Sequence, residues 1–76
     1  MTAEAAALAE AALAFAGRDD VTSAQRCGAV ALNVALTATG SVEGARAALG
    51  GFRSGGGAGL ELLKQLTDGD AAERIA

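Results

Sequence analysis

The stretch from Thr22 to Gly40 constrains the fold most, because it is a long apolar run with a helix signal at each end. Thr22 is followed by Gln25 at the spacing of a capping box, in which the two side chains satisfy free backbone donors at the helix start. Gly40 suits the left-handed conformation in which many helices end. We therefore predict a helix over residues 22–39.

The apolar side chains of this predicted helix form two faces at about 100° per residue. These faces consist of Ala29, Leu32 and Leu36 on one side and of Cys27, Val30, Ala31 and Val34 on the other. A helix that is apolar over most of its circumference is normally buried on more than one side. We therefore expect it to be the central helix of the domain, with Val30 and Val34 hidden as completely as Leu32 and Leu36.

A narrow polar strip separates the two apolar faces of the predicted central helix. It is formed by Arg26, Asn33 and Thr37. We expect these side chains to face outward, either as a solvated edge or as a contact for a partner.

The N-terminal segment, residues 2–16, is rich in alanine and predicts a second helix, capped at Thr2. Leu8, Ala12 and Phe15 follow the i, i+4, i+7 rule and form its expected buried stripe. Leu13 points away from that stripe. Gly17 ends the helix, and a short charged turn follows.

The remaining segments predict two or three further short helices. A helix over 42–49 begins after a serine cap, and a helix over 60–67 carries an apolar face of leucines. Between them, residues 50–59 contain six glycines and predict a flexible loop. Residues 70–76 have the cap-like spacing of a fifth helix. The predicted fold is therefore an all-α bundle of four or five short helices in a single domain.

Composition limits what this bundle does. Of the 76 residues, 51% are hydrophobic, but most of these are alanine, so the expected core is thin. Self-association or a partner would add the stability that such a core lacks. The net charge of −3 disfavours binding to nucleic acid or to anionic membranes.

The side chains of the common catalytic and metal sites are scarce in this chain. It has no histidine and one cysteine, which excludes Ser–His–Asp catalysis and most metal sites. Cys27 is expected to be a small core residue. The adjacent acids Asp19 and Asp20 lie beside Arg18 in an exposed turn. The glycine run fits neither the phosphate-loop nor the dinucleotide-binding pattern. We expect no cofactor, no metal and no enzymatic activity, and a cytoplasmic protein without a membrane span.

Residues 35–50 carry a partial family resemblance. The matching positions are Ala35, Leu36, Thr39, Gly40, Val42, Ala45, Leu49 and Gly50. This segment resembles the first half of a Fis-type helix-turn-helix. The resemblance implies a dimeric DNA-binding protein, with Arg46, Arg53, Lys64 and Gln65 as the available contacts. The second half departs from the pattern, because the glycine-rich segment replaces the short turn and GLELLKQL has few basic side chains.

The leading hypothesis is a non-catalytic interaction module that binds another protein, as a regulator, an inhibitor or an antitoxin-like subunit, or that forms a homo-oligomer. An aromatic side chain and a guanidinium on a glycine loop suit partner recognition, so Phe52 and Arg53 are the first candidates. The strip of Arg26, Asn33 and Thr37 is the second. The structural alternative is that Phe52 folds back onto the core. The alternative function is a degenerate helix-turn-helix.

Overall fold

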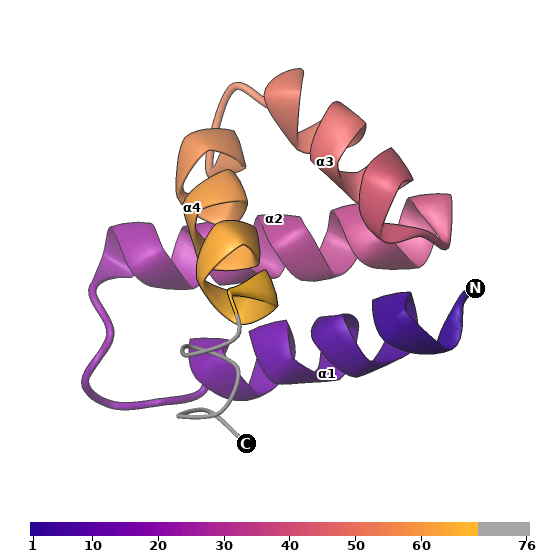
Figure 1. Ribbon diagram of the computed structural model, residues 1–76. Helices are drawn as coiled ribbons and strands as arrows, with labels where there is room; N and C mark the ends of the chain where they lie inside the picture. Colours follow the sequence, from indigo (N-terminus) through magenta and orange to yellow (C-terminus); the bar gives the residue numbers. More distant parts are fainter. Residues whose placement is uncertain (69–76) are drawn as a thin grey trace.

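The computed structural model describes residues 1–68, which form four helices and no strand (Figure 1). The helices are α1 (Ala3–Ala16), α2 (Ser23–Thr39), α3 (Val42–Gly50) and α4 (Gly56–Thr67). The predicted all-α fold class is confirmed. The predicted fifth helix, residues 70–76, lies outside the described residues.

The helix ends follow the capping signals in the sequence. The Thr22 hydroxyl accepts a hydrogen bond from the backbone N–H of Gln25 at 3.1 Å, and the Gln25 side chain accepts one from the N–H of Thr22 at 2.8 Å. Gly40 ends α2 in the left-handed region, with a φ of 74°. Thr2 and Ser41 cap α1 and α3 through their side chains. The capping box and the left-handed Gly40 are therefore confirmed.

Helices α1 and α2 run side by side in opposite directions (Figure 1), joined by three hydrogen bonds along their seam. Arg26 donates to the carbonyl of Ala16 at 2.8 Å, and Asn33 donates to the carbonyl of Ala9 at 2.9 Å. At the far end, the N–H of Thr2 donates to the carbonyl of Gly40 at 2.8 Å. These bonds fix the register of α1 against α2.

Helix α4 crosses α2 (Figure 1) at a contact between small residues. A Cβ atom placed on Gly28 of α2 would lie 2.5 Å from the Cβ of Ala58, so only glycine fits there. Gly59 also packs closely on α2, because its Cβ would lie 3.0 Å from the carbonyl oxygen of Gly28. The two backbones therefore approach more closely than larger side chains would allow.

Helix α4 begins at Gly56, four residues before the predicted start, so the predicted loop over 50–59 is too long. Glycine has a low helix propensity, which is why the sequence pattern favoured a loop. This first turn packs closely on α3, where only glycine fits, because a Cβ on Gly56 would clash with the carbonyl oxygen of Leu49. Tertiary packing therefore outweighs propensity in the first turn of α4.

The core is built from small residues on α1 and from leucines elsewhere. Ala5, Ala9, Ala12 and Ala16 are the buried residues of α1, whereas the predicted stripe residues Leu8 and Phe15 are only partly buried. The largest side chains that are fully buried are Leu32, Leu36, Leu49 and Leu63. Alanine accounts for eight of the fourteen buried hydrophobic residues. The prediction of a thin core is therefore correct.

The prediction that α2 is enclosed on opposite sides is wrong. Helix α2 contacts α1, α3 and α4, and Leu32 and Leu36 are fully buried as expected. However, Val30 is 46% exposed, Val34 is 49% exposed, and Cys27 is exposed rather than a core residue. The reason is that the three other helices all pack on the side of α2 that carries Leu32, and none of them covers the side that carries Val34.

Candidate functional site

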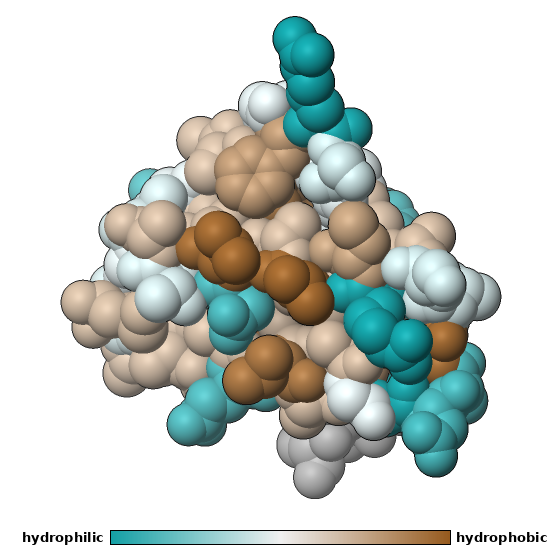
Figure 2. Space-filling model, turned by 180° about the vertical axis from the view of Figure 1, so that it is seen from behind, coloured by the Kyte–Doolittle hydropathy of each residue, from teal (hydrophilic) through white to brown (hydrophobic). Residues whose placement is uncertain are grey.

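The uncovered side of α2 belongs to a larger exposed surface, which we call the apolar face. It is formed by Leu13, Cys27, Val30, Val34 and Phe52. Figure 2 shows strongly hydrophobic side chains gathered at the centre of one side of the molecule. Scattered exposed apolar residues are normal on a protein surface, but a contiguous group marks a candidate interaction site.

Leu13 of α1 and Val30 of α2 both border the seam between these two helices. On α2, Val30 lies one turn from Arg26 and one turn from Asn33, and these two side chains reach the carbonyls of Ala16 and Ala9. Leu13 lies between those two alanines on α1. Residues three or four apart share a side of a helix, so Leu13 and Val30 flank the seam from opposite helices.

The segment between α3 and α4 forms the other border of the apolar face. Gly55 has a φ of 78° and packs against α2, where an added Cβ would lie 2.9 Å from the carbonyl oxygen of Cys27. The Cys27 Sγ lies 3.7 Å from the Ser54 Oγ. Phe52 is held by its N–H, which donates to the carbonyl of Leu49 at 3.2 Å, and it remains 37% exposed. The turn therefore carries Phe52 at the edge of the face.

Arg53 is the free cation at this edge. Its side chain is exposed, and its guanidinium has no hydrogen bond or ion pair with any residue from 1 to 68. Arg53 directly follows Phe52 in the chain, and both residues are exposed, so their role in partner binding stays a prediction.

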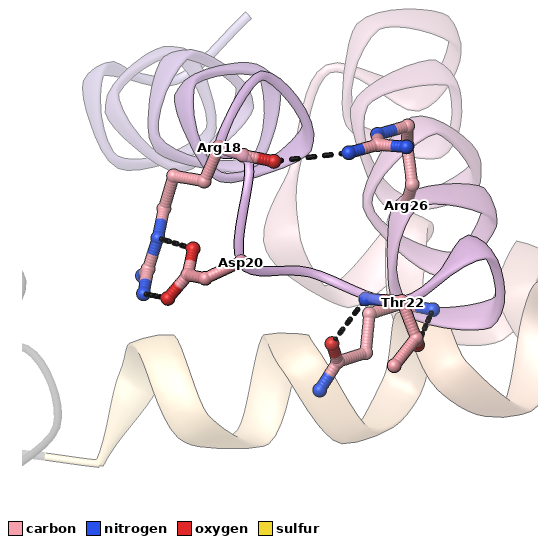
Figure 3. Close-up of polar contacts among 5 residues, drawn as sticks. Arg18, Asp20, Thr22 and Arg26 are labelled. Atoms are coloured by element: carbon pink, nitrogen blue, oxygen red, sulfur yellow. Dashed lines mark hydrogen bonds and ion pairs between the residues drawn. The ribbon is translucent and has the colours of Figure 1, made fainter.

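The predicted polar strip on α2 is engaged in bonds within the chain. Arg26 also donates to the carbonyl of Arg18 at 2.9 Å (Figure 3), and Asn33 is tied to Ala9. Thr37 donates to the carbonyl of Asn33 within its own helix at 2.8 Å. Arg26 and Asn33 therefore have a structural role in joining α1 to α2, and their role in partner binding stays a prediction.

We expect Asn33→Ala to lower the free energy of unfolding by about 1 kcal/mol, because it removes the hydrogen bond to Ala9. Thr37→Ala is the control on the same strip, since its hydroxyl bonds only within α2, and we expect it to change stability by less than about 0.5 kcal/mol. Urea unfolding followed by circular dichroism measures both. Equal effects would show that the bond across the seam adds nothing.

The turn between α1 and α2 contains an ion pair at the surface. Arg18 and Asp20 form the ion pair of this turn (Figure 3), with the Arg18 Nε 2.8 Å from Asp20 Oδ1. The guanidinium lowers the pKa of the Asp20 carboxyl below its ordinary value, and the carboxylate raises the pKa of Arg18. Both side chains are more than half exposed, so water screens the pair and its effect on stability is small.

The side chains named for the DNA-binding alternative come from three elements. Arg46 lies on α3, Arg53 lies in the following turn, and Lys64 and Gln65 lie on α4. All four are exposed.

A small pocket lies where α1, α2 and α4 meet. Its volume is about 110 Å³, and its lining residues are Phe15, Gln25, Ala58, Glu61, Leu62 and Gln65. Ligand sites usually occupy about 300–1,000 Å³, so this pocket is too small for most cofactors. Residues 1–68 contain no cluster of three metal-ligating side chains. Nor does any helix of that part have the length and apolar character needed to cross a membrane.

No protein-family model, curated protein or solved structure matches the chain. The geometry therefore defines the class: an all-α helical bundle with an exposed apolar face. Val30 and Val34 were predicted to be buried, so this face was not expected from the sequence. One signal was available, since Leu13 pointed away from its own buried stripe.

Proposed function

We propose that this chain is a non-catalytic interaction module that binds another protein through the apolar face and the adjoining Arg53. The observation that carries the proposal is the gathering of Leu13, Val30, Val34 and Phe52 on one side of a small bundle. Interfaces are commonly centred on aromatic and aliphatic side chains, with arginine among the strongest contributors. A regulator, an inhibitor or an antitoxin-like subunit fits this chemistry.

Arg53 and Phe52 are the residues to test. Arg53→Ala removes an unpaired, exposed cation, so we expect weaker partner binding with an unchanged melting temperature. Phe52→Ala removes a ring that is partly covered, so we expect weaker binding together with a small loss of stability, about 1 kcal/mol. Lys64→Ala, another exposed cation, is the matched control and should leave binding unchanged.

The measurement is affinity capture from extracts of the source cells with the wild-type chain and the three variants, followed by titration of the captured protein against each. We expect to capture a partner protein that binds both the wild type and Lys64→Ala. The same partner should be lost from Arg53→Ala and Phe52→Ala. Retention by all three variants would overturn the assignment of the site.

Binding to mixed duplex DNA, measured over a series of salt concentrations, distinguishes the alternative function, DNA binding, from the proposed one. DNA binding releases counterions, so the affinity of a DNA-binding protein falls steeply as salt rises. We expect no binding at low salt, because the chain has a net charge of −3. Steep, salt-sensitive binding that Arg46→Ala and Lys64→Ala reduce would replace the proposed function with the helix-turn-helix alternative.

A further inference from the structure

The open side of α2 is free of charge along almost its whole length. Residues 27–42 contain no charged side chain. Val30 and Val34, one turn apart, are half exposed, and the exposed residues that flank them on this side, Cys27 and Ala38, are small. A smooth uncharged helix side with a pair of valines at its centre allows another helix to approach closely.

The size and composition of the chain favour a second copy as the occupant of this side. Within residues 1–68, eight of the fourteen buried hydrophobic residues are alanine, so this part of the chain buries little apolar area for its length. A standard interface covers about 800 Å² on each partner, which is under a fifth of the 4525 Å² that one copy exposes. The broad side of the molecule measures 28 Å by 26 Å, so its area is of the same order as that of a standard interface.

We propose that two copies of this chain pair through α2, with the two α2 helices antiparallel about a two-fold axis. In this arrangement Val30 of each copy packs against Val34 of the other, so both valines are covered by one self-complementary contact. The uncharged side brings no like charges together. The dipoles of the two antiparallel helices also attract each other.

The pairing goes beyond the proposed function, because it gives Val30 and Val34 to a second copy and leaves Phe52 and Arg53, at the edge of the apolar face, to the other protein. Arg53 lies in the turn at the edge of the apolar face. Arg53→Ala should therefore reduce capture of the other protein and leave self-association unchanged. If the chain dimerises but captures no other protein, the pairing is supported and the proposed function is contradicted.

Sedimentation over a concentration series tests the pairing. We expect wild type to shift from monomer to dimer as concentration rises. Val30→Asp and Val34→Lys each place an unpaired charge in the contact, so each should weaken dimerisation by about a hundredfold or more. Both valines are half exposed in one copy, so both variants should keep the helical circular dichroism of the wild type. A wild type that stays monomeric throughout would overturn the proposal.

Mixing the two variants tests the antiparallel arrangement. In the mixed dimer, the new carboxylate at position 30 faces the new ammonium at position 34, while the second contact keeps Val34 against Val30. We expect dimerisation to return in this mixture. A mixture of Val30→Asp with Val30→Lys is the control, because position 30 does not face position 30 of the other copy, and it should stay monomeric. Dimerisation in the control mixture alone would overturn the antiparallel arrangement. So would the absence of dimerisation in both mixtures when the variants are folded.

Discussion

Leu32→Ala is expected to lower the free energy of unfolding by about 2–5 kcal/mol. Leu32 is one of the four largest side chains that are fully buried within residues 1–68. Its removal loses the transfer free energy of the side chain and leaves a cavity that alanine-rich neighbours cannot fill. A core of this size rarely supplies more than about 3–5 kcal/mol, so the variant should be largely unfolded at room temperature.

Leu13→Ala is the control for this change, because the same atoms are removed from a side chain that is 60% exposed. We expect a change within about 0.5 kcal/mol. Urea unfolding, followed by circular dichroism at a protein concentration low enough to keep the chain monomeric, compares the two midpoints. A loss at position 13 as large as that at position 32 would contradict the burial of α1 and α2 described above.

Gly28→Ala is expected to be destabilising even though alanine is the better helix former. The new Cβ would lie 2.5 Å from the Cβ and 2.7 Å from the carbonyl carbon of Ala58, and 2.9 Å from the backbone nitrogen of Gly59. Rotation of a side chain cannot relieve contacts with backbone atoms, so α4 must move away from α2. Such overpacking lowers stability by about 1–3 kcal/mol. The better helix propensity of alanine returns about 1 kcal/mol, so we expect a net loss of stability.

Gly57→Ala provides the matched control, since the same methyl group is added to α4 where no atom lies within 4 Å. Here only propensity acts, and we expect the free energy of unfolding to rise by about 0.5–1 kcal/mol. Thermal and urea unfolding of the two variants should therefore shift in opposite directions. A stabilising effect at both positions would show that the close crossing of α2 and α4 does not exist.

Local sequence signals predicted the helix ends where a cap was present. The capping box of Thr22 and Gln25 and the left-handed Gly40 gave the bounds of α2 to within one residue. These signals are reliable because the bonds they describe form between residues close in sequence. No such signal exists at Gly56, where α4 begins without a side-chain cap, and the prediction there was wrong.

Within the proposed site, only Phe52 and Arg53 were expected from the sequence to be contact residues. An aromatic residue beside a cation on the α3–α4 turn stood out in the sequence, and the structure places both at the edge of the apolar face. The valines of α2 did not stand out as surface residues, because valine is ordinarily buried. Helical periodicity shows which residues share a side of a helix, but it does not show which side the rest of the chain covers.

The sequence by itself determined an all-α fold, the caps of α1, α2 and α3, and a core made mainly of alanine and leucine, because propensity, capping and composition act locally. Only the tertiary structure decided that Leu32 is buried while Val34 is exposed, and that glycines at positions 56 and 59 are helical. The physical reason is that both outcomes depend on long-range packing, because α1, α3 and α4 together cover one side of α2, and α4 packs on α3 at Gly56 and crosses α2 at Gly59. That crossing is set by the close approach of Gly28 to Ala58, two residues that lie far apart in the sequence.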